Sequence, residues 1–454
     1  MRNPLLVPDL KELIHSGETA ALREFFAEYH PARVAEVVED LEPTEGDAIF
    51  GLLDPRHQAE VMGYLDDEAQ VRLAEAMAPE VAAALLHIMS HDERADLFKR
   101  LDEDHASAVS RHLAHAERED IRRLSSYEPG TAGAVMTTDY VTLPPELTVR
   151  EALDRIRLEA PDRETIYYNY VIDEKRRLLG LVSLKALILA RPRAHIAEIM
   201  KRDIVMARVD DDQEAVAQQI EQYDLIAIPI LDAADMLVGI VTHDDAMDIL
   251  RREQTEDILR FGGVAADPEA DDSPYWQSGV LSAVRRRLGW LGILFFAELG
   301  TGFVSRHYEW VALKQPHLIH FTALLIGTGG NAGSQVVGTI IRGLSLGEIT
   351  SGQAWRVVAR EWLTGALLGL ALGGFGFFQA WVVRGEGRMF SLVIAATVLC
   401  ICMWANTVGA MIPLLAHRLG RDPAVVSAPL ITTLVDATGL AIFYSIAIVL
   451  LNLS

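Results

Sequence analysis

The sequence predicts a multidomain membrane protein with an α-helical, superhelical N-domain, a duplicated α/β region, a connecting helix and a transmembrane domain of five α-helices. Three observations predict this. Residues 275–454 carry 12 Lys and Arg against 7 Asp and Glu, which leaves 29 against 57 for residues 1–274. A short motif in the acidic half returns 64 residues later. Five long apolar segments then follow one another to the end of the chain.

The composition excludes several classes of protein. An acidic half within a chain of net charge −23 disfavours nucleic acid as a partner and favours cations. Cys400 and Cys402 both lie in an apolar segment, so neither a disulfide framework nor a zinc site is predicted. We find no nucleophile–base pair and no phosphate loop with a catalytic lysine, so the protein is predicted not to be an enzyme. The first residues lack the apolar core of a signal peptide, and the acidic half is expected to stay in the cytoplasm.

Residues 1–130 form the predicted cytosolic helical N-domain. Runs such as VRLAEAM, VAAALLHIM and ADLFKRL carry apolar residues three and four apart, as helices do. Helix-start signals occur at Asp54-Pro55 and Asp66-Asp67, and Ser90 and Glu93 have the spacing of a capping box. Helices repeated at roughly 12 residues favour a superhelical domain, with an ordinary helical bundle as the alternative.

Residues 131–242 contain the duplication. The motif at 134–139 (AVMTTD) returns at 198–203 (EIMKRD), and each copy continues with a strand, a helix, two strands around a turn and a last helix. The predicted strand pairs are Tyr168–Ile172 with Leu179–Ser183, and Ala227–Leu231 with Val238–Thr242. This pattern resembles a tandem of CBS domains. The resemblance implies sensing, often of an adenine nucleotide, and dimerisation; a purely structural tandem remains the alternative.

Residues 243–264 form the predicted connecting (plug) helix between the two halves. Five acids are spread along it: Asp245, Asp248, Glu253, Glu256 and Asp257. A solvated linker helix could carry such charges too, but this helix is the only covalent path between the acidic half and the apolar half. The polar residues 265–273 (AADPEADDS) predict a flexible turn into the membrane.

The transmembrane domain is predicted over residues 275–454. Its helices are expected at about 288–306, 317–341, 362–383, 390–416 and 423–451, since about 20 apolar residues cross a bilayer. Arg285, Arg286 and Arg287 before the first helix predict a cytoplasmic start. Five crossings then place the C-terminus outside.

One carboxylate, Asp436, stands near the middle of the last segment, with Thr432 and Thr433 a turn earlier. A carboxylate in mid-membrane costs at least about 2.5 kcal/mol on insertion scales, so it usually faces protein or a water-filled path. A buried acid that is protonated, or paired to another helix, is the alternative. Glu298 in the first segment is either a second intramembrane anion or a hydrogen-bonded acid near the helix end, and we favour the latter.

The second segment contains a glycine-rich run, Gly327–Gln335 (GTGGNAGSQ). Within an apolar run, small residues favour close helix packing or a pore lined by backbone over a phosphate cradle. Asn331 and Gln335 are four apart and share a face. Gly365, Gly369 and Gly373 predict close packing of the third segment.

Three motifs together carry a family resemblance: GGNAGSQ, IIRGLSLGEI and RDPAVVSAPLITTLVDATGLAIFY. They resemble the MgtE-type magnesium channel and transporter family, and the order of the domains agrees. The chain departs from the family at Ala323, where Pro is expected, and at Ala428, where some members have Asn. The resemblance implies a homodimer with a cation pore on its symmetry axis, lined by Asp436, Thr432, Thr433, Asn331 and Gly330. Oxygen donors of this kind suit Mg²⁺, and no His or thiolate cluster suggests a softer metal.

The resemblance also places regulatory Mg²⁺ between the N-domain, the CBS tandem and the connecting helix. The acids that correspond by position are Asp92, Asp96, Asp212, Glu214, Asp224, Asp245, Asp248, Glu253, Glu256 and Asp257. Without a cation these carboxylates repel one another, and bound Mg²⁺ would let the domains close and shut the pore.

The sequence therefore predicts a Mg²⁺-selective, Mg²⁺-gated homodimeric channel of the cell inner (plasma) membrane, for magnesium uptake and homeostasis. Besides Mg²⁺, the tandem implies ATP as a ligand, with no contacting residue assigned. Two alternatives stay open. One is a secondary divalent-cation transporter in which Glu298 and Asp436 relay protons or exchange Na⁺. The other is a non-conducting, membrane-anchored sensor of nucleotide or Mg²⁺. We assign no order of preference among Mg²⁺, Mn²⁺, Co²⁺ and Ni²⁺ from the sequence, because recognition of an ion through its water shell discriminates weakly between them.

Overall fold

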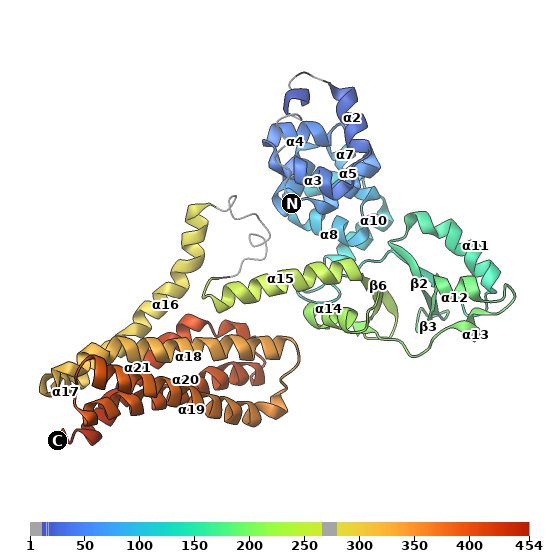
Figure 1. The fold of residues 1–454 in the computed structure, drawn as a ribbon. Coiled ribbons are helices and arrows are strands. Elements are labelled where there is room, and N and C mark those ends of the chain that lie inside the picture. Colours follow the sequence, from blue (N-terminus) through green and yellow to red (C-terminus); the bar gives the residue numbers. More distant parts are fainter. Residues whose placement is uncertain (1–10, 15, 17, 266–278, 454) are drawn as a thin grey trace. The chain divides into compact units, whose positions relative to one another are not determined.

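The computed structural model describes residues 11–14, 16, 18–265 and 279–453. The predicted turn at 265–273 lies outside these residues from position 266 onward, as do positions 275–278 of the predicted transmembrane domain. Residues 1–253 form one compact unit and residues 254–454 a second. The fold class that the sequence predicts is confirmed: helices, then an α/β tandem, then one connecting helix and a helical C-terminal region (Figure 1).

The N-terminal helices begin every 12 residues between positions 31 and 115, at the spacing that the sequence predicts. Their apolar faces meet in one core that extends from Leu22 to Ile121. Proline opens several of them, where the missing N–H is not needed. The helices are α2 (Thr19–Ala27), α3 (Pro31–Asp40), α4 (Pro43–Phe50), α5 (Pro55–Tyr64), α6 (Asp67–Ala76), α7 (Pro79–Ile88), α8 (His91–Arg100), α9 (Glu103–Ser110) and α10 (His115–Leu124).

Two of the predicted helix starts are confirmed with their capping residues. At the third, the helix begins where predicted but the cap differs. Asp54 accepts from the backbone N–H of Arg56 at 3.1 Å, and Asp66 from that of Ala69 at 2.7 Å. Ser90 does precede α8, but its side chain forms no cap hydrogen bond. The Glu93 carboxylate lies instead against Gly63 of α5, where a Cβ would come within 2.8 Å of Glu93 Cδ. A capping box therefore does not form, because Glu93 points across to another helix.

The tandem consists of two three-stranded sheets of the same design. In the first sheet, β1 (Tyr140–Leu143) is parallel to β2 (Thr165–Ile172), which is antiparallel to β3 (Leu178–Ser183). In the second, β4 (Ala207–Arg208) is parallel to β5 (Ala227–Leu231), which is antiparallel to β6 (Leu237–Thr242). The helices of this region are α11 (Val149–Glu159), α12 (Leu184–Leu189), α13 (Ile196–Ile199) and α14 (Gln213–Gln222), with a 3₁₀ turn at Ala160–Asp162.

The second unit is a helical bundle entered by the end of α15 (His243–Phe261). Within it α18 packs against both α20 and α21, α19 packs along α20, and α16 packs against α21 (Figure 1). The long helices are α16 (Val280–His307), α18 (Ile319–Ser345), α19 (Ala354–Phe378), α20 (Arg388–Arg418) and α21 (Ala428–Leu450). Short elements connect them: α17 (Glu309–Lys314), 3₁₀ turns at Pro316–Leu318, Ser351–Gln353 and Pro423–Val425, and a π-helical turn at Gln379–Val383.

Four of the described helices are long and apolar enough to cross a membrane: α16, α19 with its π-helical turn, α20 and α21. The second predicted span, α18, has 27 residues but does not reach this apolar character. Its run Gly327–Gln335 is the reason, since glycine and polar residues there replace aliphatic ones. The fifth predicted span also begins later than expected: Pro423–Val425 form a 3₁₀ turn, and α21 begins at Ala428 after Ser427 as N-cap.

The glycines of α19 allow it to lie against the backbone of α20, as the sequence predicts. A Cβ at Gly365 would come within 2.8 Å of the Cys402 carbonyl oxygen, and one at Gly369 within 2.7 Å of Leu399 Cα. A Cβ at Gly373 would lie 2.8 Å from the Ala395 carbonyl oxygen. Small residues thus set the distance between these two helices.

Candidate cation sites

The first candidate site lies where α18 meets α21. A Cβ at Gly330 would come within 2.8 Å of Thr432 Cγ2, and one at Gly329 within 2.8 Å of Val435 Cγ1. Ser334 and Thr432 also face each other, with their hydroxyl oxygens 3.1 Å apart. The glycine-rich run of α18 therefore lies directly against the turn of α21 that precedes Asp436.

Asp436 is half-buried on α21, and its Oδ1 atom is shielded from solvent with no hydrogen-bond partner among the residues that the structure describes. The hydroxyls of Thr432 and Thr433 donate to the carbonyl oxygens of Ala428 and Pro429, each at 3.1 Å. Because those hydroxyl protons are directed to the backbone, oxygen lone pairs remain available to a cation or to the water around it. A carboxylate oxygen without a partner and two hydroxyl oxygens suit a hydrated Mg²⁺.

The structure brings together Gly330, Thr432 and the start of the turn that carries Asp436, and among the described residues none forms a hydrogen bond with the Asn331 side chain. Asn331 is exposed on the surface of the single chain, as is Gln335. These two amides do share a face, as the sequence predicts, and that face is open in the protomer. Sequence reasoning missed Asn406 of α20, which is buried and whose two amide atoms have no hydrogen-bond partner in the described ranges.

The second candidate site is a gathering of carboxylates from three parts of the first unit. Asp92 and Glu93 are in the first turn of α8, Glu164 precedes β2, and Asp244 and Asp245 are in the first turn of α15. Only Asp92 and Asp245 are among the predicted ligands. Glu164 had no recognisable signal in the sequence, and Glu93 was assigned to a cap.

Burial and mutual repulsion raise the pKa of these acids. Loss of solvent, and then the charge of Asp92, raise the pKa of Glu93 to about 7 and that of Asp245 to about 8. Burial also raises the pKa of Asp92, with Asp96 adding to the effect. Glu164 is exposed as a whole residue, yet its carboxylate loses solvent and is repelled by Asp92 and Asp245, which raises its pKa as well. The acids therefore form an electrostatic cluster, which we call the acidic cluster.

As the structure describes them, the carboxylates of the acidic cluster do not form a direct metal-coordination site. Within the described ranges, no three His, Cys, Asp or Glu side chains converge closely enough to hold a metal ion directly. Asp92 Oδ1 is nevertheless buried, and no described residue forms a hydrogen bond with it. Mg²⁺ dehydrates reluctantly and usually keeps several of its waters. Carboxylates that are too far apart to coordinate the ion directly can therefore contact it through those waters.

The other predicted acids are spread over the two units with partners of their own. Asp96 pairs with Lys99 at 3.2 Å, and Asp248 with Arg251 at 3.6 Å. Asp212 is the N-cap of α14, Glu214 accepts from Gln218, and the exposed Asp224 has a positive φ of 50°. Glu253 accepts from Gln213 at 2.8 Å, Glu256 pairs with Arg260, and Asp257 accepts from Ser345 at 3.3 Å.

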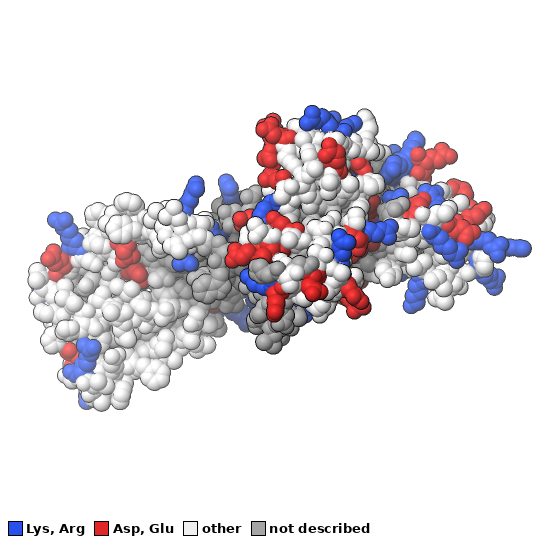
Figure 2. Space-filling model, turned by 90° about the horizontal axis from the view of Figure 1, so that it is seen from above, with Lys and Arg blue, Asp and Glu red and all other residues white. Residues whose placement is uncertain are grey.

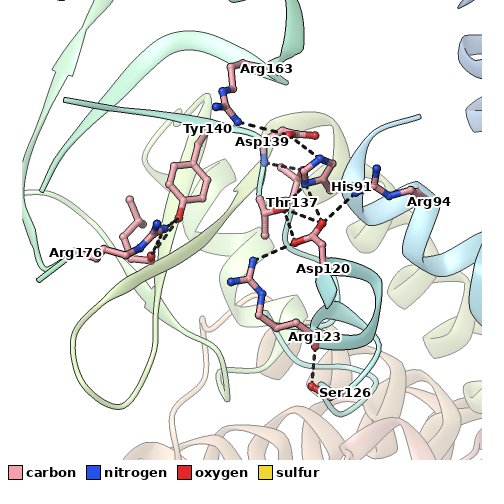
Figure 3. Close-up of polar contacts among 12 residues, drawn as sticks. His91, Arg94, Asp120, Arg123, Ser126, Thr137, Asp139, Tyr140, Arg163 and Arg176 are labelled. Carbon is pink, nitrogen blue, oxygen red and sulfur yellow. Dashed lines mark hydrogen bonds and ion pairs between the residues drawn. The ribbon is translucent and has the colours of Figure 1, made fainter. Parts of the chain in front are cut away.

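A polar network beside the acidic cluster ties α8 and α10 to the start of the tandem (Figure 3). His91 lies between two carboxylates, with Nδ1 3.0 Å from Asp120 Oδ2 and Nε2 3.1 Å from Asp139 Oδ1. Arg94 adds a contact to Asp120 at 3.1 Å. Burial alone would raise the pKa of Asp120, but His91 and the nearby arginines hold it below its usual value. This network places the acids of α8 next to the tandem.

Charged side chains gather over the first unit, whereas most of the visible surface of the helical bundle carries none (Figure 2). The two candidate sites therefore differ in setting. One is a single carboxylate in an apolar bundle, and the other is a group of carboxylates on a charged, water-exposed unit.

Family models match both the N-terminal half of the chain and the C-terminal helices. Residues 322–446 match the family model described as a divalent cation transporter, MgtE, and residues 29–130 match the MgtE intracellular N domain. Two CBS domains match at 132–193 and 196–252. The predicted tandem of CBS domains is thereby confirmed.

Individual proteins similar to this chain carry the name of the same family. The chain is 38% identical to the magnesium transporter MgtE of Thermus thermophilus over 98% of this chain and 99% of that protein, and 37% identical to that of Enterococcus faecalis over 73% and 71%. A solved cytosolic domain of the Mg²⁺ channel MgtE in complex with ATP is 37% identical, with a TM-score of 0.52, and covers 54% of this chain and 99% of that one. The soluble part of a magnesium transporter is 33% identical, with a TM-score of 0.51, over 54% and 97%. With this similarity along its full length, the chain belongs to the MgtE family of magnesium transporters, which are not enzymes.

Proposed function

We propose that this transporter is a Mg²⁺-selective homodimeric channel for magnesium uptake and homeostasis, closed by cytosolic Mg²⁺ bound at the acidic cluster. The observation that carries the gating is the meeting of Asp92, Asp245 and Glu164, from the N-domain, the connecting helix and the CBS tandem. Three parts of one unit contribute like charges to one place, where a cation or protons can relieve the repulsion.

The energy available for gating follows from Coulomb's law. Two unit charges about 8 Å apart near a protein surface interact by about 2 kcal/mol at an effective dielectric constant of about 20. Several mutually repelling carboxylates therefore disfavour the closed arrangement until Mg²⁺ neutralises them. An ion that binds the closed state better must favour closure, and closure must in turn strengthen its binding.

The remaining predicted acids extend this proposal along the connecting helix. Asp96, Asp212, Glu214, Asp224, Asp248, Glu253, Glu256 and Asp257 would take up further Mg²⁺ when the N-domain and the tandem close. Since α15 is one continuous helix from His243 to Phe261, a displacement of its first turns is carried to its last turn. That last turn belongs to the bundle, and so closure of the cytosolic half would shut the pore.

The pore itself is proposed at Asp436, with Thr432, Thr433, Asn331 and Gly330 lining it. The open face that carries Asn331 favours a second copy of the chain as the other wall. Two Asp436 carboxylates facing each other would hold one hydrated Mg²⁺ through its water shell. The C-terminus would lie outside and the first unit in the cytoplasm, with α18 as the fifth crossing because its polar run faces the pore and not lipid. We also propose that ATP binds the CBS tandem, on the strength of the similarity to a cytosolic domain solved with ATP.

The decisive experiment is patch-clamp recording of the full-length reconstituted protein, with Mg²⁺ on the cytosolic side stepped from none to several millimolar. We expect a Mg²⁺ current that falls as cytosolic Mg²⁺ rises, is lost in Asp436→Ala, and closes less steeply in Asp245→Asn. Asp154→Asn is the control, because this exposed acid on α11 pairs only with Arg157 in the described structure.

Other results would favour the alternatives. Flux that requires a proton or Na⁺ gradient would favour a secondary transporter. A wild-type protein that carries no Mg²⁺ but still becomes compact on Mg²⁺ addition would favour a non-conducting sensor. Chemical cross-linking of the protein in membranes tests the homodimer in the same preparation.

A further inference from the structure

Two contacts fix the register of α16 against α21. Trp290 Nε1 donates to Ser427 Oγ at 2.8 Å near one end, and the hydroxyl oxygens of Tyr308 and Ser445 are 3.3 Å apart near the other. Both pairs are separated by 137 residues in sequence. Because both helices rise about 1.5 Å per residue, the helices run in the same direction and stay in step along their length.

This register places a second carboxylate at the level of Asp436. Glu298 comes eight residues after Trp290, as Val435 comes eight residues after Ser427, so Glu298 lies level with Val435 and its neighbour Asp436. Each carboxylate is well inside an apolar helix that is long enough to cross a membrane.

Within the part of the chain that the structure describes, no basic side chain pairs with either acid. Glu298 is exposed on the single chain, and among the described residues none forms a hydrogen bond or ion pair with it. Asp436 Oδ1 also lacks a partner. The sequence contains no Lys or Arg between Arg287 and Arg306, and none after Arg421. The alternative of Glu298 as a hydrogen-bonded acid near a helix end therefore has no support in the contacts of this residue.

An intramembrane acid without a partner rarely faces lipid, because insertion of the charge costs at least about 2.5 kcal/mol. Such residues almost always face a bundle interior or a water-filled path. Two carboxylates at one level, with no basic group between them, repel each other and attract cations. A divalent ion gains twice as much from the added charge as a monovalent ion at the same place.

We infer that Glu298 is a second carboxylate of the intramembrane cation site, where it helps Asp436 to hold a hydrated divalent cation and sets the preference for divalent over monovalent ions. This inference rests on the proposed pore at Asp436. It assigns α16 a part in ion selection, in addition to α18 and α21. Glu298 contacts the ion through its water shell and forms no bond to Asp436.

The test is the permeability ratio of Mg²⁺ to Na⁺, from reversal potentials of the full-length protein in bilayers at low cytosolic Mg²⁺. Wild type, Glu298→Gln, Glu298→Asp and Glu309→Gln are compared. Glu309 is an exposed acid in the first turn of α17, beyond the end of α16, and serves as the matched control. We expect Glu298→Gln to lower the ratio by about 3- to 10-fold, Glu298→Asp to keep most of it, and Glu309→Gln to leave it unchanged.

A change in selectivity separates this role from a structural one, because a loosened bundle would lower the current without changing the ratio. Wild-type Mg²⁺ current with an unchanged ratio in Glu298→Gln overturns the inference and leaves the proposed function standing. A wild-type protein without Mg²⁺ current overturns both. Loss of coupling to a proton gradient in Glu298→Gln, at an unchanged ion ratio, would overturn the inference in favour of a proton relay.

Discussion

Arg260, in the last turn of α15, forms an ion pair with Asp422, which lies just before α21. Asp422 also accepts from the backbone N–H of Ala424 at 2.7 Å, so it caps the 3₁₀ turn that leads into α21. The end of the connecting helix is thus held to the entry of the helix that carries Asp436. Within the bundle, this is the contact through which we expect α15 to act on the pore.

The first prediction tests this pair by a double-mutant cycle of Arg260→Gln and Asp422→Asn. Both side chains are 36% exposed, so we expect a coupling energy of about 0.2–1 kcal/mol that weakens at high salt. The measurement is the cytosolic Mg²⁺ concentration for half-closure, which should rise by up to about fivefold in each single variant. Arg208→Gln, which breaks an exposed pair with Asp235 in the tandem, is the control. Fully additive effects in the double variant would contradict a direct interaction.

The second prediction concerns the contact of α18 with α21. Gly330→Ala should force these helices apart, because its Cβ would lie 2.8 Å from Thr432, and overpacking costs about 1–3 kcal/mol. Gly327→Ala is a matched control in the same helix, since no described residue would lie within 4 Å of its Cβ. We expect Gly330→Ala to lower the thermal unfolding midpoint and the Mg²⁺ flux, and Gly327→Ala to unfold at the same temperature or slightly higher. Equal effects of the two variants would mean that the contact does not matter.

The third prediction concerns Glu93, which sequence reasoning assigned to a cap. Glu93→Gln removes one charge from the acidic cluster, which relieves roughly 1 kcal/mol of repulsion at this half-buried place. We expect the cation-free protein to resist trypsin about fivefold better in residues 1–253, and added Mg²⁺ to protect it less than it protects wild type. Asp154→Asn should change neither rate. Unchanged protection in Glu93→Gln would show that this carboxylate takes no part in cation binding.

The fourth prediction is a dependence on pH. The raised pKa values of Glu93, about 7, and Asp245, about 8, mean that the folded unit binds these protons more tightly than the unfolded chain does. Without Mg²⁺, the stability of the first unit should therefore be highest below the ordinary pKa values of 4.5 for Glu93 and 3.8 for Asp245, and should fall as pH rises from there until it levels off above about 7 and about 8. Mg²⁺ competes with the same protons, so its half-closing concentration should fall as pH rises from 6 to 8.5. Half-closure at the same Mg²⁺ concentration at both ends of this range would contradict the assignment.

The periodic features of this chain could be predicted because each depends on neighbours in sequence. Apolar residues three and four apart, repeated at 12 residues, predict the N-terminal helices, and the duplicated motif predicts two sheets of one design. The stripe Gly365, Gly369 and Gly373 predicts close packing because residues four apart share a helix face. Asp436 could also be identified from the sequence, because a charged residue within an apolar run is apparent without knowledge of the fold.

The tertiary structure decided which distant residues meet. Glu164 joins Asp92 and Asp245 because the strand order of the tandem brings it there, and no local pattern encodes that approach. The capping box at Ser90 does not form because the Glu93 carboxylate packs against Gly63 of α5. Glu298 lies level with Asp436 only through the common register of α16 and α21. Two contacts establish this register, and each joins residues that are 137 apart in sequence. Sequence by itself determined the elements and the charges, because these depend on local periodicity and composition. Packing decided which charges share a site, because electrostatic interaction depends on distance in space.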